Sequence, residues 1–248
     1  MIVYPNAKIN LGLNILKKRK DNYHDISSVF YPLQDCVDIL EIVKSEKFEF
    51  TKSGIIIPDG ENICEKAWKL LHNDFGVGNV NIHLHKQIAI GAGLGGGSAD
   101  ASFTLKALNK LFDLKITNKE LEKYALKLGA DCPFFIENIP KLVEGIGENM
   151  SPINLDLSEF IIRLINPEIH ISTKESYSGV VSQIPELSVD EIIQLPIKEW
   201  KNKLKNDFEV SIFEKHPKLK ELKENLYNEG ALYASMSGSG SVLYGVFT

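Results

Sequence analysis

The sequence predicts an α+β fold built from two domains. Strand-like alternation of apolar and polar residues dominates the first part of the chain, and helical patterns alternate with strands further on. This order lacks the regular βαβ rhythm of a doubly wound parallel sheet. The 248 residues suit one large or two small domains, and the polar, irregular stretch 149–159 suggests a boundary. We therefore expect domains at 1–150 and 151–248.

Strands are expected to dominate the N-terminal part. Apolar residues alternate with polar ones from 7 to 15, which predicts a strand with one polar face. The three isoleucines at 55–57 are followed by Pro58-Asp59-Gly60, a sequence typical of a turn at a strand end. The N-terminal strands are therefore expected at 7–15, 37–43, 48–50, 55–57 and 80–84.

Helix starts are predicted from capping residues. Asn62 precedes the apolar stripe of a helix that runs to about residue 75. Thr117 and Glu120 form a capping box, and Ser172 or Thr173 and Ser188 are further caps. The other expected helices are 101–111, 206–214 and 217–229, and the other expected strands are 140–143, 152–153, 160–165, 231–236 and 242–247.

Composition excludes several classes of protein. Hydrophobic residues make up 44% and charged residues 25%, as in an ordinary soluble globular protein. The net charge of −5 argues against non-specific nucleic-acid binding. The N-terminus lacks a signal-peptide pattern, no stretch approaches the ~18 apolar residues of a membrane helix, and three cysteines stand far apart. We expect a cytoplasmic protein, a monomer or weak homodimer, without nucleic-acid or membrane partners.

The most distinctive feature is the glycine loop at residues 91–100 (GAGLGGGSAD). It follows an expected strand and precedes an expected helix. Glycines let the backbone approach a phosphate closely, and free N–H groups at a helix start face an anion. Only two of the 28 basic residues are Arg, so a phosphate site here must use Lys and backbone N–H groups.

Three other interpretations of this loop compete with a phosphate cradle. Gly91, Gly93 and Gly96 satisfy the dinucleotide fingerprint GxGxxG, but Asp113, the acidic residue about 20 positions on, ends a helix instead of a strand. A Walker A loop fails because no Lys precedes Ser98. A merely flexible turn is disfavoured because five glycines in seven residues are entropically costly.

Several motifs in order along the chain resemble those of the GHMP small-molecule kinases. They are PNAKIN at 5–10, RKDNYH at 19–24, the glycine loop, LGADCPFF at 128–135, EGIGE at 144–148, NDFE at 206–209 and SGSGS at 237–241. Asn22 stands where the family usually has Gly, but Asn tolerates the same turn conformations. The usual Pro before the glycine loop is replaced around Ala89.

The resemblance implies a fold and an activity. It implies an N-terminal domain like domain 2 of ribosomal protein S5 and a ferredoxin-like C-terminal α/β domain. It also implies ATP-dependent phosphorylation of the 2-hydroxyl of 4-diphosphocytidyl-2-C-methyl-D-erythritol in non-mevalonate isoprenoid biosynthesis, with Mg²⁺. The alternatives are a mevalonate- or homoserine-type kinase of the same family, or a dinucleotide-binding oxidoreductase.

The resemblance also implies residue roles. Asp131 is the expected catalytic base, although a carboxylate just before Pro133 also suits a helix cap. Lys8 is expected to stabilise charge beside it, although most strand lysines are simply solvated. The expected substrate-binding residues are Asn10, Tyr23, His24, Thr173, Tyr177, Ser239 and Gly240. The expected ATP-binding residues are Asn62, Ile63, Lys86, Gly91, Ala92, Gly93, Leu94, Gly95, Gly96, Gly97, Ser98 and Ala99, with Ser98 also the candidate Mg²⁺ ligand.

Overall fold

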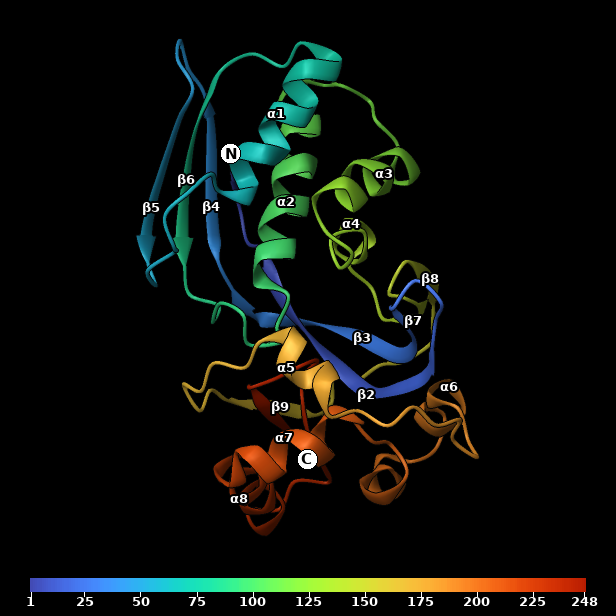
Figure 1. Cartoon of the computed structure of the whole chain (residues 1–248). Coiled ribbons are helices and arrows are strands. Elements are labelled where there is room, and N and C mark those ends of the chain that lie inside the picture. The colour runs from blue at the N-terminus through green and yellow to red at the C-terminus, as the bar shows by residue number, and fades with distance from the viewer. The chain divides into compact units, whose positions relative to one another are not determined.

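The computed structural model describes the whole chain, residues 1–248 (Figure 1). Its internal contacts divide it into two compact units. Unit 1 comprises Met1–Lys8, Pro32–Ile90 and Gly95–Ile139, and unit 2 comprises Ile9–Tyr31, Gly91–Leu94 and Pro140–Thr248.

This division differs from a single boundary near residue 150, because strand pairing groups distant segments. Strand β7 (Lys141–Gly145) pairs antiparallel with β3 (His24–Val37) at positions 26–30, and β8 (Asn149–Pro152) pairs with β7. Residues 140–152 therefore group with the C-terminal part of the chain, together with much of β2 (Asn6–Lys18).

Unit 1 is a sheet covered by helices. The sheet order is β1 (Ile2–Val3), β4 (Ile39–Lys44), β6 (Val80–Lys86) and β5 (Glu49–Gly54), with only the β5–β6 pair parallel. Its core joins buried sheet residues such as Leu40 and Leu84 to buried helix residues such as Leu71 and Leu105. The helices are α1 (Ile63–Phe75), α2 (Gly96–Leu111), α3 (Asn118–Leu128) and α4 (Phe134–Glu137), and Figure 1 shows α1 and α2 on one face of the sheet.

The predicted caps of unit 1 are confirmed. Asn62 accepts the N–H of Cys64 at 2.9 Å, and Glu65 completes a capping box by accepting the N–H of Asn62. Thr117 and Glu120 form the same arrangement before α3. A satisfied N-cap is worth about 0.5–2 kcal/mol, so these short-range signals set the helix starts.

Unit 2 contains two sheets and five short helices. One sheet has the order β2-β3-β7-β8, and the other has β10 (Tyr233–Met236), β11 (Leu243–Phe247) and β9 (Ile161–Ile165) in antiparallel pairing. Buried Phe208, Ile212 and Leu226 pack with Leu243 in its core. The helices are α5 (Thr173–Ser178), α6 (Val189–Ile193), the 3₁₀ helix η1 (Ile197–Asn202), α7 (Phe208–Lys215) and α8 (Pro217–Asn228).

One strand prediction was wrong, and one strand was not predicted. Residues 55–57 are not a strand, because β5 ends at Gly54 and the chain then turns. The 14-residue strand β3 escaped prediction, because its polar residues and Pro32 interrupt the apolar alternation. None of the helices is long and apolar enough to span a membrane.

Candidate active site

The second half of the glycine loop belongs to unit 1 and approaches two lysines closely. Gly95 is the N-cap of α2 with φ +69°, and a Cβ there would lie 3.1 Å from Cγ of Lys8. A Cβ on Gly96 would lie 3.0 Å from Nζ of Lys86. The glycines therefore let the first turn of α2, with its free N–H groups, lie against both lysine side chains.

The first half of the loop belongs to unit 2 and contacts a second glycine-rich turn, residues 237–240 (SGSG), which we call the second glycine turn. Gly93 has φ +82°, and a Cβ there would lie 2.0 Å from the carbonyl oxygen of Ser237. The Ser237 hydroxyl donates to the Gly93 carbonyl at 2.8 Å. This is an approach that only glycine permits, which explains the glycine at this position without invoking flexibility.

We expect Gly93→Ala to lower stability and weaken ATP binding. Positive φ on a residue with a side chain costs about 1–3 kcal/mol, and the contact with Ser237 adds a steric clash. Gly97→Ala is the matched control, because a Cβ there meets nothing within 4 Å and lies in the first turn of α2. Urea denaturation of both variants tests this expectation, which fails if Gly93→Ala is as stable as Gly97→Ala.

Lys8 and Asp131 form an ion pair within unit 1. Lys8 Nζ lies 3.7 Å from Oδ2 of Asp131, and the side-chain exposures are 4% and 36%. Burial lowers the pKa of Lys8, and the neighbouring Asp131 carboxylate opposes that shift. The lysine is thus not the solvated strand cation of the alternative interpretation, while Asp131 keeps an accessible carboxylate. Asp131 precedes α4, whose N-cap is Pro133.

Lys86 lies in a buried ionic network in unit 1, which sequence reasoning missed. Its ammonium lies 2.5 Å from Oδ2 of Asp38 and 2.7 Å from Oδ2 of Asp100, and all three side chains are at most 3% exposed. Burial favours the neutral amine, but the two carboxylates outweigh it and raise the pKa of Lys86. The network lies under the start of α2, and phosphate contact by Lys86 stays a prediction.

The two carboxylates of this network differ in their partners. Oδ1 of Asp38 accepts the N–H groups of Gln87 and Ile88 at 2.6 and 2.9 Å, whereas Oδ1 of Asp100 has no hydrogen-bond partner. Burial raises the pKa of Asp100 to about 8. Burial therefore favours the neutral form of Asp100, the carboxylate with an unpartnered oxygen.

The expected substrate-binding residues include the aromatic side chains of Tyr23, His24 and Tyr177, and two of these three rings stack on each other. In unit 2 the ring of His24 stacks on that of Tyr177, with centroids 5.1 Å apart and planes at 26°, and Phe208 contacts Tyr177 edge-on at 4.9 Å. The side chain of Tyr23, by contrast, is 60% exposed. Asn22 adopts φ +68°, which confirms that Asn replaces Gly without losing the turn.

Asn10 lies next to the second glycine turn in unit 2. Its N–H donates to the Ser237 hydroxyl at 3.3 Å, and its Nδ2 donates to Ser28 at 3.0 Å. Ser239 accepts the Ser176 hydroxyl, and the N–H of Gly240 donates to Ser237. Thr173 is exposed in the first turn of α5. Ligand contact by these residues stays a prediction.

The remaining predicted ATP residues serve helix starts. The amide oxygen of Asn62 is used by the α1 cap, and Ile63 packs against the core of unit 1. Ser98 is half-buried in the first turn of α2 and hydrogen-bonds the thiol of Cys132, whose pKa is raised by burial to about 11. No group of three or more His, Cys, Asp or Glu could hold a metal. A single hydroxyl fits only a Mg²⁺ that arrives with its own phosphate and water ligands.

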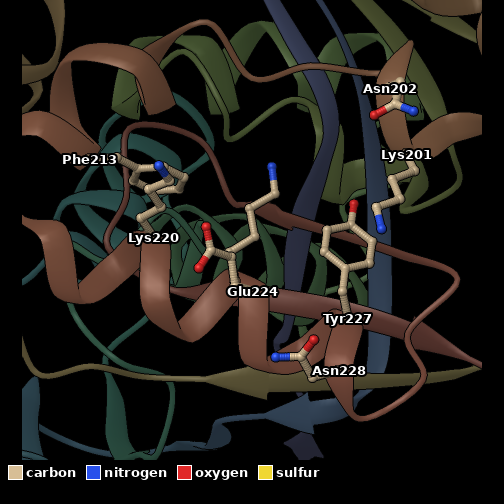
Figure 2. Close-up of a pocket in the computed structure, with 8 residues that line it drawn as sticks. Lys201, Asn202, Phe213, Lys220, Glu224, Tyr227 and Asn228 are labelled. Carbon is tan, nitrogen blue, oxygen red and sulfur yellow. The ribbon is translucent and has the colours of Figure 1, made fainter.

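A surface pocket of unit 2 lies apart from these residues. It encloses about 400 Å³, and Figure 2 shows Tyr227, Glu224 and Lys201 at its wall. Lys201 Nζ lies 4.3 Å from the centre of the Tyr227 ring, an exposed cation–π contact. None of the predicted site residues lines this pocket.

The site thus combines a glycine-lined helix start with a buried lysine paired with an accessible carboxylate, groups that can stabilise charge in phosphoryl transfer. The family model of the GHMP kinases N terminal domain matches residues 62–138, and that of the GHMP kinases C terminal matches 189–248. The chain belongs to the GHMP kinases. The dinucleotide-binding alternative is wrong, and the sheet of unit 1, in which only one strand pair is parallel, agrees with this.

Relatives of one activity match the whole chain. The 4-diphosphocytidyl-2-C-methyl-D-erythritol kinase of Azobacteroides pseudotrichonymphae is 50% identical over 100% of this chain and 93% of its own length. That of Bacteroides fragilis is 48% identical over 100% of this chain and 92% of its own.

Solved structures confirm the expected GHMP kinase fold. A crystal structure of 4-(cytidine 5'-diphospho)-2C-methyl-D-erythritol kinase matches 99% of this chain and 90% of its own, with 31% identity and a TM-score of 0.87. Mevalonate kinase of Methanococcus jannaschii matches with 13% identity and a TM-score of 0.73 over 100% of this chain and 90% of its own, a likeness of fold alone.

Proposed function

We propose that this protein transfers the γ-phosphoryl group of ATP to the 2-hydroxyl of 4-diphosphocytidyl-2-C-methyl-D-erythritol, as an early step of non-mevalonate isoprenoid biosynthesis in the cytoplasm. The observation that carries the proposal is the Lys8–Asp131 pair beside the glycine-lined start of α2. The names of its full-length relatives support the choice of substrate. The residue roles below belong to the proposal.

Asp131 acts as the base. Its carboxylate accepts the proton of the attacking hydroxyl while the hydroxyl oxygen bonds to the γ-phosphorus and the bond to the ADP oxygen breaks. Lys8 lies beside it; burial lowers the pKa of Lys8, and the Asp131 carboxylate opposes that shift. The Lys8 side chain, 3.7 Å from the Asp131 carboxylate, stabilises the charge that develops on the attacking oxygen.

The glycine loop binds the phosphates of ATP through backbone N–H groups. The start of the 16-residue helix α2 supplies unpaired N–H groups and the positive end of its dipole. Ser98 in the first turn would hold a Mg²⁺ that arrives with ATP. The metal, when bound, neutralises phosphate charge, and the chain itself provides orientation.

We expect Tyr177→Ala to raise the KM for the cytidine substrate. Tyr177 supplies an aromatic face for the cytosine ring, and a stacked base is worth about 1–3 kcal/mol, so the KM increases about tenfold while the KM for ATP stays unchanged. Tyr4→Ala is the matched control, because Tyr4 is an exposed tyrosine of unit 1. Steady-state kinetics with each substrate varied test this; an unchanged KM for the cytidine substrate contradicts the stacking role.

A coupled assay of ADP release with the purified protein tests the proposed function. Turnover is expected with 4-diphosphocytidyl-2-C-methyl-D-erythritol, ATP and Mg²⁺, and not with mevalonate or homoserine. Turnover with one of those alcohols instead would assign the chain to another activity within the GHMP kinases.

A further inference from the structure

The motif Asn206-Asp207-Phe208-Glu209 has no role in the chemistry above, yet three of its four residues are buried. Asn206 is 2% exposed and Glu209 is 9% exposed. Polar side chains are rarely buried without hydrogen bonds, so their partners reveal what the motif holds.

Asn206 uses both of its amide donors on the second glycine turn. Nδ2 donates to the carbonyl oxygens of Met236 and Gly238 at 2.8 and 2.9 Å, and Oδ1 accepts the N–H of Phe208 at 3.0 Å. The two carbonyls flank Ser237. The side chain thus fixes the backbone on both sides of the residue that contacts Gly93 and Asn10.

Glu209 and Asp207 of the same motif accept hydrogen bonds from residues of the strands β10 and β2. Oε1 of Glu209 accepts the N–H of Met236 at 2.8 Å and the Ser235 hydroxyl at 3.0 Å. Oδ2 of Asp207 accepts the N–H of Ile15 in β2 at 2.8 Å. Lys223, which lines the pocket of Figure 2, lies 2.5 Å from the other oxygen of Glu209.

We infer that Asn206 is a positioning residue for phosphate binding. It sets the backbone of the 237–240 turn, and Ser237 in turn supports the first half of the glycine loop through the Gly93 carbonyl. The inference rests on the proposed role of the glycine loop in ATP binding. Asn206 touches no ligand itself and acts through the two carbonyls.

The test is Asn206→Asp, in which a carboxylate of the same shape cannot donate to either carbonyl. Isothermal titration with a non-hydrolysable ATP analogue and Mg²⁺ at pH 8 is expected to show a Kd raised about tenfold with the stoichiometry unchanged. A merely structural role would instead lower the stoichiometry, as unfolded protein accumulates, and leave the Kd of the folded fraction intact.

A pH series adds a readout specific to the lost donors. Burial against carbonyl oxygens raises the pKa of the introduced carboxyl, and its protonated form regains one donor. The Kd ratio of variant to wild type is therefore expected to fall as the pH is lowered from 8 to 6. Asn202→Asp is the matched control, because Asn202 is exposed at the pocket of Figure 2 and undergoes the same change of charge.

The outcomes separate this inference from the proposed function. A wild-type Kd in a folded Asn206→Asp variant overturns the inference. If that variant does not fold, the Kd of Asn206→Ala is measured instead. The same rise in Kd is expected, and an unchanged Kd again overturns the inference. If the wild-type protein binds the ATP analogue but does not phosphorylate the cytidine substrate, the proposed substrate is overturned. The Kd of the Asn206→Asp variant for the ATP analogue still decides whether Asn206 is a positioning residue.

Discussion

Asp131→Asn is expected to reduce the rate of phosphoryl transfer by about 10²- to 10⁴-fold, the range of a general base in mutagenesis. The amide keeps the shape and hydrogen-bonding reach of the carboxyl but cannot take the proton of the attacking hydroxyl. ATP affinity is expected to stay nearly unchanged, because the loop glycines and not Asp131 bind the phosphates in the proposed site. Single-turnover kinetics and equilibrium ATP binding measure the two quantities separately.

The matched control for this variant is Asp113→Asn. Asp113 is exposed, with a side-chain exposure of 83%, and its φ of +50° is a conformation that Asn also tolerates. The control is expected to keep the wild-type rate. An Asp131→Asn protein that retains a tenth or more of the rate would contradict the role of base, while leaving the placement of ATP intact.

The pH dependence of the residual activity gives a second check on the pair. In the wild type, burial lowers the pKa of Lys8, and the Asp131 carboxylate offsets part of that shift. Removing the carboxylate lets that pKa fall further, so Lys8 loses its charge at a lower pH. The alkaline decline of the Asp131→Asn rate is therefore expected to begin at lower pH than in the wild type.

Features encoded by neighbouring residues could be predicted from the sequence. The caps at Asn62, Thr117, Ser172 and Ser188 each rely on residues within one helical turn, and all four are present. The glycine loop was identified in the same way, because its spacing is local. Pairing Lys8 with Asp131 needed the family resemblance, since 123 positions separate the two residues.

Features that depend on distant partners could not be predicted from pattern alone. Lys86 looks like a free lysine near a phosphate loop, but Asp38, 48 positions earlier, reaches it in the fold. The signal that was available is Asp100, the one acidic residue of α2, because a buried carboxylate needs a compensating partner. The role of Asn206 also depends on a turn 32 positions later.

Replacing Lys86 by Met is expected to lower the free energy of unfolding by about 3–5 kcal/mol at pH 8, because two buried carboxylates lose their cation. Lys69→Met, at an exposed lysine paired with Glu61, is the control and should cause no measurable loss. Adding Asp100→Asn to Lys86→Met should recover part of the stability, because the remaining Asp38 keeps two backbone donors. Urea denaturation measures each difference.

The sign of the pH dependence distinguishes this network from a generic packing defect. Burial already raises the pKa of Asp100 to about 8, and without the Lys86 ammonium that pKa rises further in the folded state, so the folded state holds a proton that the unfolded chain releases. The deficit of Lys86→Met is therefore expected to be largest at pH 8 and to shrink towards pH 5.5. A variant as stable as the wild type at pH 8, but unable to bind ATP, would instead show that Lys86 contributes to ATP binding and not to the stability of the fold.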